Sequence, residues 1–218
     1  MVASYNIHGA VGLDRRHDPD RIVRVLRALD ADVIALQEVD TAWHYLAEAT
    51  GMHAVAGVTR SSHRGHYGNA ILTRLPVESQ TSVPIGIDGR EPRGVLQAVL
   101  RTGGETVSVI NTHLGLRDHE RRVQIVRVAA LIGECTATRS IVAGDFNEWR
   151  GRAPALAPIV SHMGAQASLR TFPSLWPLFA LDRIWARAPA RIVSLEVVRT
   201  ALTRRASDHL PIRAHVEL

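Results

Sequence analysis

The chain has 218 residues, a formal net charge of +5 and a hydrophobic fraction of 46%. All 26 basic residues are arginines, which excludes Schiff-base chemistry and a Walker-type phosphate loop, because both need a lysine amine. Guanidinium groups are therefore the permanent cations that can hold a phosphate. The basic balance fits a polyanionic partner, and it fits an arginine-rich proteome equally well.

Cysteine usage and hydropathy bear on the compartment. Cys135 is the single cysteine, so an intrachain disulfide is impossible, and the composition suits a reducing compartment. We recognise no secretory signal pattern after Met1, and no apolar run approaches the ~20 residues that a membrane helix needs. We therefore expect a cytoplasmic protein without an integral membrane segment.

Short apolar segments typical of β-strands recur along the whole chain. In chain order they are Val2–Asn6, Val33–Gln37, Asn69–Thr73, Val95–Arg101, Val107–Thr112, Ile141–Gly144, Leu181–Ala186, Ile192–Val198 and Leu210–Val216. Gly103 and Gly104 are expected to form the turn of a hairpin.

Three segments between these strands have helix signals. Asp18 followed by Pro19 predicts a helix start, and apolar residues follow at helical spacing, namely Ile22, Val25, Leu26 and Leu29. Thr41 is expected to cap a short helix that runs through Ala49. Asp118 is expected to start a third helix, whose apolar positions are Val123, Val126 and Ala130.

The balance of elements predicts the fold class. Strands outnumber helices, and several strands follow one another with only turns between them. This order favours an α+β protein with two mixed sheets face to face and helices outside.

Polar side chains gather where the expected strands end. They are Asn6, Glu38, His113, Asp145, Asn147, Asp208 and His209. Strand ends at one rim of a sandwich can converge from distant parts of the chain, and rigid elements hold side chains well enough for a site.

Gly144-Asp145-Phe146-Asn147 follows a hydrophobic strand and offers a carboxylate beside an amide. This pair can bind a hydrated metal or orient a water, and the alternative is an Asx turn that closes the strand. Glu38 also ends an apolar strand, where a buried carboxylate needs a partner such as Mg²⁺ or an arginine. Asn6 can ligate metal through its oxygen, orient a carboxylate ligand, or simply end its strand.

Two histidines are candidates for phosphate chemistry. His113 can contact a phosphate or protonate a leaving group, although a surface histidine is the simpler interpretation. His209 follows Asp208, and neighbouring residues on a strand point oppositely, so another acid should orient the imidazole. Asp182 can do so, as a buried aspartate does in catalytic triads, and its alternative role is a salt bridge to an arginine.

These segments together resemble the endonuclease/exonuclease/phosphatase superfamily, the DNase-I-like phosphoesterases. The matching segments, in the family's order, are 5–9 (YNIHG), 36–39 (LQEV), 68–74 (GNAILTR), 111–114 (NTHL), 144–147 (GDFN), 181–184 (LDRI) and 207–211 (SDHLP). The resemblance implies one domain over residues 1–218 and a four-layer α/β/β/α sandwich. It also implies a site at one rim that uses Mg²⁺ or Mn²⁺.

Roles follow from the resemblance residue by residue. Glu38, Asn6 and Asp208 correspond to the metal shell. Asp145 and Asn147 correspond to the pair that positions the attacking water. His209, oriented by Asp182, and His113 correspond to the histidines at the scissile phosphate. The division of labour between Asp145 and His209 is left open, as is the number of metals.

The expected function is metal-dependent hydrolysis of a phosphodiester or phosphomonoester. The substrate can be a nucleic acid, a phospholipid headgroup or a small phosphate ester, and a catalytically silent binding module is the competing class. Asn111-Thr112-His113-Leu114 stands where abasic-site enzymes carry tyrosine-proline-asparagine, which argues against abasic-site repair. His8 stands where some nucleases place an acid.

Two further features bear on the substrate. Arg93 and Arg117 are candidate phosphate contacts, with ordinary surface arginines as the alternative. The apolar, proline-broken segment Phe172–Phe179 precedes Asp182. We interpret it as core packing, with a substrate-facing or membrane-touching loop as the alternative.

Overall fold

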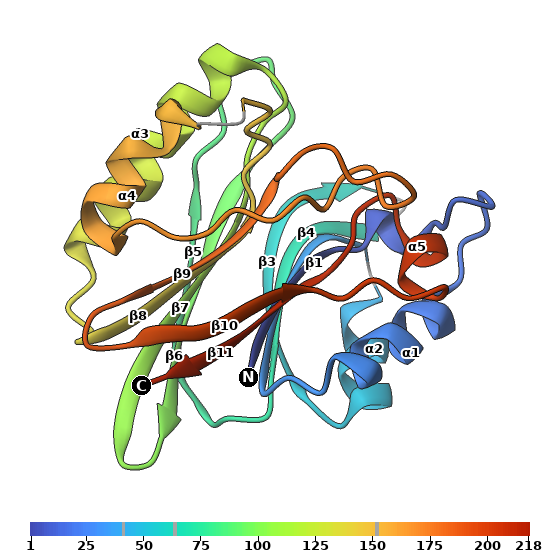
Figure 1. The fold of residues 1–218 in the computed structure, drawn as a ribbon, viewed down its shortest axis with the longest axis horizontal. Helices are drawn as coiled ribbons and strands as arrows, with labels where there is room; N and C mark the ends of the chain where they lie inside the picture. Colours follow the sequence, from blue (N-terminus) through green and yellow to red (C-terminus); the bar gives the residue numbers. More distant parts are fainter. Residues whose placement is uncertain (41, 63–64, 151–152) are drawn as a thin grey trace.

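The computed structural model describes residues 1–40, 42–62, 65–150 and 153–218. Their strands form two mixed sheets that pack face to face (Figure 1). The six-stranded sheet contains, in spatial order, β10 (Arg191–Val197), β11 (Ile212–Glu217), β1 (Val2–Asn6), β2 (Val33–Val39), β4 (Gly65–Thr73) and β3 (His53–Ser62). The five-stranded sheet contains β5 (Val77–Pro84), β6 (Gly94–Thr102), β7 (Glu105–His113), β8 (Arg139–Asp145) and β9 (Asp182–Arg187).

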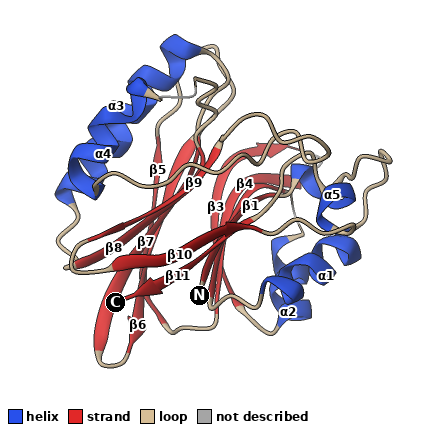
Figure 2. Ribbon diagram, in the orientation of Figure 1, coloured by secondary structure: helices blue, strands red, loops and turns tan. Residues whose placement is uncertain are grey.

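Helices cover the outer faces of both sheets (Figure 2). The six-stranded sheet carries α1 (Pro19–Leu29), α2 (Trp43–Thr50) and α5 (Thr203–Ala206), and the five-stranded sheet carries α3 (Asp118–Glu134) and α4 (Ala157–Met163). Short 3-10 turns lie at η1 (His8–Ala10) and η2 (Pro154–Leu156). The predicted four-layer α/β/β/α sandwich is confirmed. Among the described residues, none of the helices has the length and apolar character needed to cross a membrane.

Three hydrophobic cores separate the four layers, and side-chain alternation along the strands explains them. On β2, Ile34 and Leu36 face the core beneath α1 and α2, whereas Val33 and Ala35 face the other sheet. β8 behaves similarly, with Val142 packed toward α3. Strands buried on both faces read as continuous apolar runs, which is why these segments were recognisable in the sequence.

The nine predicted strands are all present, with ends that shift by a few residues. β3 and β5 were missed. β5 has the sequence VESQTSVP and its residues are almost all exposed, because it is the edge strand of its sheet. β5 is held by backbone pairing with β6 and has no apolar face of its own. The sequence of this strand therefore lacks the hydrophobic pattern by which the nine strands were predicted. The expected hairpin turn is confirmed: Gly103 and Gly104 join β6 to β7.

The helix start at Asp18 is confirmed, because its carboxylate accepts a hydrogen bond from the Arg21 N–H at 2.8 Å. The helix predicted through Ala49 corresponds to α2, although its expected cap, Thr41, lies outside the described residues.

The predicted apolar face of α3 is wrong. Val123, Val126 and Ala130 are exposed, and the buried face includes the polar residues Arg121 and Gln124. The reason lies in the loop that follows β7. Gln124 Oε1 accepts from the Gly115 N–H at 2.7 Å, and Arg121 donates to the Leu116 carbonyl. Buried backbone groups of this loop need partners, and the inward face of α3 supplies them.

Asn111 on β7 links the two sheets through buried hydrogen bonds. Its amide nitrogen donates to the carbonyls of Leu36 and Ala70, at 2.8 and 2.9 Å, and both belong to the opposite sheet. Its oxygen accepts from Gln37 Nε2 at 2.8 Å. One fully buried side chain therefore satisfies three polar groups between layers that are otherwise apolar.

Replacing Asn111 should destabilise the whole sandwich. In Asn111→Ala, two carbonyls and one amide lose buried partners, and we expect the free energy of unfolding to fall by about 2–4 kcal/mol. Urea denaturation followed by circular dichroism measures the loss. Thr81→Ala, on the exposed face of β5, is the control and should change stability little. A loss below about 0.5 kcal/mol in Asn111→Ala would show that the intersheet contact is unimportant.

Candidate active site

Strand register brings the polar strand ends together. His113 pairs with Asp145 across β7 and β8, and Asp145 pairs with Asp182 across β8 and β9. On the other sheet, Asn6 at the end of β1 pairs with Gln37, so that Glu38 is the next residue. The two sheets thus present their polar ends at the same rim of the sandwich.

A cavity of about 300 Å³ opens at this rim. Seven of the ten residues expected in the site line it, namely Glu38, Arg93, His113, Asp145, Asn147, Asp208 and His209. Asn6 and Asp182 are buried behind these residues and contact them directly. Arg117 is exposed before α3 and is not a lining residue, so its phosphate contact stays a prediction.

Asn6 connects the two halves of the site. Its amide nitrogen donates to Glu38 Oε1 and to Asp145 Oδ2, each at 3.0 Å. Its oxygen accepts from the His8 N–H at 3.0 Å, which fixes the amide orientation, since only the nitrogen can donate to carboxylates. In this arrangement Asn6 orients two carboxylates, and its role as a metal ligand stays a prediction.

Asp145 is almost completely buried at the end of β8. Its Oδ1 accepts from the Asn147 N–H at 2.9 Å, and its Oδ2 lies 3.5 Å from His113 Nε2 and 3.6 Å from His209 Nε2. Burial raises the pKa of Asp145 to about 6, although the charge of His209 and the Asn6 hydrogen bond oppose this shift. A carboxylate with this pKa is ionised at neutral pH and can still take up a proton.

The preceding Gly144 is required for this geometry. It has a φ of 150°, and a β-carbon there would lie 2.0 Å from the Thr112 carbonyl oxygen on the neighbouring strand. Only glycine allows β7 and β8 to approach so closely beside the aspartate.

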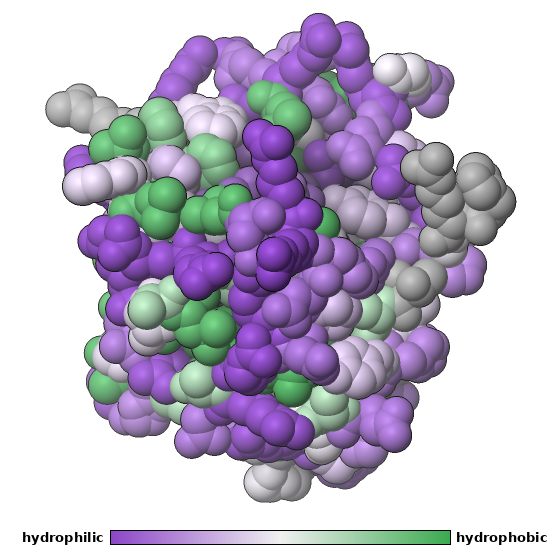
Figure 3. All heavy atoms as spheres, turned by 90° about the vertical axis from the view of Figure 1, so that its right-hand side faces the viewer, coloured by the Kyte–Doolittle hydropathy of each residue, from purple (hydrophilic) through white to green (hydrophobic). Residues whose placement is uncertain are grey.

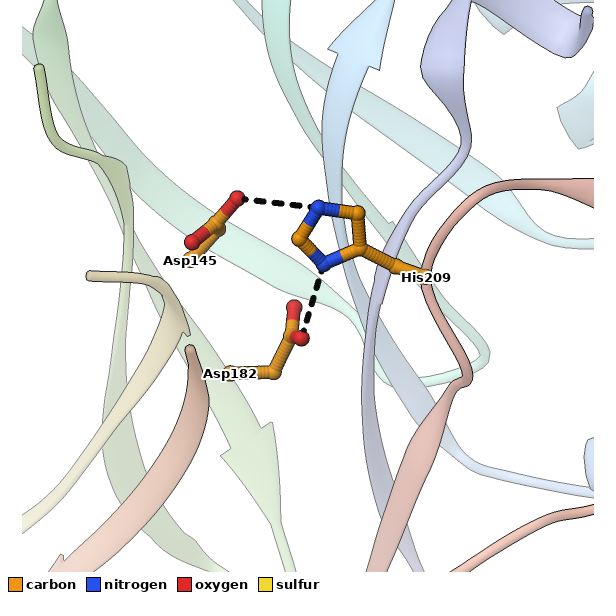
Figure 4. A group of neighbouring side chains, drawn as sticks. All are labelled: Asp145, Asp182 and His209. Atoms are coloured by element: carbon orange, nitrogen blue, oxygen red, sulfur yellow. Dashed lines mark hydrogen bonds and ion pairs between the residues drawn. The ribbon is translucent and has the colours of Figure 1, made fainter. Parts of the chain in front are cut away.

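His209 lies between two buried carboxylates (Figure 4). Its Nδ1 is 2.9 Å from Asp182 Oδ2, which also accepts from the Thr171 hydroxyl. Burial alone would lower the pKa of His209, but the negative charges of Asp182 and Asp145 outweigh it and raise the pKa to about 10. His209 is therefore an imidazolium at neutral pH, fixed by Asp182 through one nitrogen and directed at Asp145 through the other.

His113 is held differently. Arg93 donates from Nη1 to His113 Nδ1 at 2.8 Å, and because a guanidinium can only donate, Nδ1 must be the accepting nitrogen. The proton of the neutral ring then lies on Nε2, on the side of Asp145. Burial and the charge of Arg93 lower the pKa of His113 well below its ordinary value. His113 is thus a neutral hydrogen-bond donor at the floor of the cavity.

Asn147 adopts a left-handed backbone conformation with a φ of 48°. Its amide nitrogen donates to the Leu114 carbonyl at 2.9 Å and lies 3.1 Å from His113 Nε2. The hydrogen bond to Leu114 binds the loop after β8 to the loop after β7.

Glu38 has a φ of 56° at a register shift between β2 and β4. This irregularity re-aims its side chain, which is 22% exposed and lines the cavity. Tyr67 on β4 also lines it, and burial together with the charge and hydrogen bond of the Glu38 carboxylate raises the pKa of the Tyr67 phenol. Sequence reasoning missed Tyr67, although it immediately precedes the recognised segment that starts at Gly68.

The interpretation of Phe172–Phe179 as core packing is wrong for most of its length. Only Ser174 is fully buried there, whereas Trp176 is 73% exposed. Phe172 lines the cavity beside Trp149, and its ring centroid lies 4.9 Å from that of His209. The segment forms a wall of the site and continues into solvent, and backbone hydrogen bonds between Phe172 and Phe179 and from Ser174 to Asp208 hold it there.

The charges around the cavity favour a bound cation. Four carboxylates line it (Glu38, Glu91, Asp145 and Asp208), and the lining cations are Arg93 and His209. Glu38 and Asp208 keep partly exposed carboxylates, which are the hard oxygen ligands that Mg²⁺ and Mn²⁺ prefer. Asp145, Asp182 and His209 also form a buried cluster with ligand atoms within 4.8 Å of one another. In that cluster, however, both nitrogens of the His209 ring already face carboxylates, Nδ1 toward Asp182 and Nε2 toward Asp145.

Comparison with known proteins identifies relatives over the whole chain. A 32% identical protein of Escherichia coli K12, "Uncharacterized protein YbhP", matches 100% of this chain and 96% of its own length. The mannosyl-6-phosphatase of Bacteroides thetaiotaomicron superposes with a TM-score of 0.80 at 18% identity, covering 100% of this chain and 99% of that chain. D. rerio TDP2 complexed with a single-strand DNA product superposes with a TM-score of 0.78 at 21% identity, covering 100% of this chain and 98% of that chain.

The structural likenesses, at these identities, show the shared fold. The family assignment comes from the sequence, because residues 3–209 match the family model. The chain therefore belongs to the Endonuclease/Exonuclease/phosphatase family.

Proposed function

We propose that this protein is a divalent-metal-dependent hydrolase of phosphoester bonds, with a phosphodiester or a phosphomonoester as substrate. The observation that carries the proposal is the convergence of Glu38, Asp145, His113 and His209 from both sheets around one cavity. Members of the family act on phosphoester bonds, and this site has the groups that such a reaction needs.

Glu38 and Asp208 are the residues that would hold Mg²⁺ or Mn²⁺. Both line the cavity with partly exposed carboxylates, and Asn6 fixes the orientation of Glu38. When bound, the metal supplies charge neutralisation at the phosphate and polarises a water for attack.

The remaining residues divide the work by their hydrogen bonds. Asp145 is the group that takes the proton of the attacking water, because it is the ionised carboxylate between the two imidazoles. Asn147 positions that water with it. His209 and His113 direct N–H donors into the cavity, where they would bind the phosphate oxygens as negative charge develops. Asp182 keeps His209 charged and oriented.

The alternative substrate is a nucleic acid, in which case the enzyme is a nuclease acting on DNA or RNA. The solved relatives include a sugar phosphatase and a protein bound to single-strand DNA, so the fold accommodates either chemistry. Arg93 is the one arginine that lines the cavity among the described residues, and this gives no continuous basic track for a polynucleotide.

Hydrolysis of bis-p-nitrophenyl phosphate tests the proposal, with plasmid DNA, inositol phosphates and phospholipid headgroups as further substrates. We expect turnover with Mg²⁺ or Mn²⁺ and none with EDTA. Asp145→Asn keeps the shape but removes the proton acceptor, and should lower kcat by about 100-fold or more. Glu196→Gln, an exposed acid on β10, is the matched control and should retain full activity. No turnover of any substrate, or an unaffected Asp145→Asn variant, would reject the proposal.

Asp182→Asn tests the positioning of His209. The amide preserves the volume but removes the negative charge at Nδ1, so we expect kcat to fall by about 100-fold or more while KM changes little. Asp182 lies behind His209 and does not line the cavity, which is why substrate affinity should persist. A fall in kcat that is accompanied by a clear fall in the melting temperature of the variant would indicate a structural role instead.

A further inference from the structure

Four large apolar side chains are exposed together at the end of the segment before β9. We call Leu175, Trp176, Leu178 and Phe179 the apolar tip. Trp176 is 73% exposed and Leu178 is 61% exposed, whereas Trp43 and Trp185 are buried. Exposing several large apolar residues within five positions is costly in water, and such patches mark interaction sites.

The apolar tip is held in place rather than free to fold inward. Phe172 and Phe179 form a β-bridge, and the Trp176 N–H donates to the Pro173 carbonyl at 3.1 Å within the turn. At the base, the Ser174 N–H donates to the Asp208 carbonyl at 2.7 Å. These backbone contacts fix the exposed side chains before any partner binds, which reduces the entropy lost on binding.

The same base connects the apolar tip to the active site. The Thr171 hydroxyl donates to Asp182, and the Phe172 ring packs against His209. Trp149 packs edge-on against Phe172 and Phe179, with ring centroids 5.5 and 5.1 Å away. Leu116, which lines the cavity and is 63% exposed, adds a further apolar side chain at the opening. The exposed apolar surface therefore borders the mouth of the catalytic cavity.

The charge beside the apolar tip is positive. Arg199 and Arg204 each donate a hydrogen bond to the Leu175 carbonyl, at 3.2 and 3.4 Å, and Arg170 is exposed at the start of the segment. Residues 169–181 contain no acidic side chain. Arg204 belongs to α5, and the side of the molecule where α5 lies shows hydrophobic residues gathered among hydrophilic ones (Figure 3).

We propose that the apolar tip is a membrane-docking surface, which places the mouth of the cavity against an anionic phospholipid bilayer. A tryptophan flanked by leucines fits the interface between headgroups and acyl chains, and adjacent arginines fit anionic headgroups. A second copy of this chain would bring like charge against like charge, since the net charge is +5. A nucleobase stacks on aromatic faces and gives the exposed leucines no partner.

The docked orientation has a consequence for the substrate, which rests on the proposed phosphoesterase function. Phosphoesters of lipid headgroups would lie at the cavity mouth, next to Phe172 and His209. Docking itself can be measured without turnover, so its failure and that of the proposed function are distinguishable.

Vesicle binding of the full chain tests the proposal. We expect co-sedimentation with vesicles of equal parts phosphatidylcholine and phosphatidylglycerol, weaker binding to phosphatidylcholine alone, and release by salt. Tryptophan emission should shift to the blue on binding, because Trp176 is the most exposed tryptophan. The double variant Trp176→Ala/Leu178→Ala should lose at least about tenfold in partitioning.

The control truncates exposed apolar side chains elsewhere. Val123→Ala/Val126→Ala, on the outer face of α3, should bind vesicles like the parent. Both double variants should hydrolyse bis-p-nitrophenyl phosphate at the parent rate, since neither changes a cavity residue. Absence of binding to anionic vesicles, or equal binding by the Trp176 and Leu178 variant, would overturn the proposal. Quenching of Trp176 by a single-stranded oligonucleotide, without vesicle binding, would assign the surface to a nucleic acid instead.

Discussion

The amide of Asn6 donates one hydrogen bond to a carboxylate of each sheet, and the site depends on this contact. Glu38 belongs to the six-stranded sheet and Asp145 to the five-stranded sheet, so the two acids are brought together only when the sheets pack. Asn111 adds a second polar link between the same two sheets, farther from the rim along β7. Because an otherwise apolar interface contains these few directional bonds, it fixes how the sheets align as well as how tightly they pack.

Burial then gives chemically similar groups different properties. His113 and His209 both point Nε2 at Asp145, yet one is neutral and the other charged, because Arg93 faces the first and Asp182 the second. The residue that contacts Nδ1 of each ring therefore decides whether that imidazole carries a charge. The environment likewise sets the basicity of Asp145, because burial raises its pKa and makes it a stronger base.

The sequence allowed the fold class and most strands to be predicted, because strands buried on both faces are continuous apolar runs that end in polar residues. β5 was not predictable in this way, since its partner strand rather than its side chains defines it. The inward face of α3 and the exposure of Trp176 depend on long-range contacts, with the loop after β7 and with Asp208. The amide orientation of Asn6 likewise follows only from its three-dimensional neighbours.

The most direct test of the central claim is a crystal structure with Mn²⁺ and inorganic phosphate, using anomalous scattering to locate the metal. The account predicts a peak in the cavity against the carboxylates of Glu38 and Asp208, with phosphate within hydrogen-bonding distance of His113 and His209. A peak enclosed by Asp145, Asp182 and His209, or a cavity without metal at saturating Mn²⁺, would contradict it.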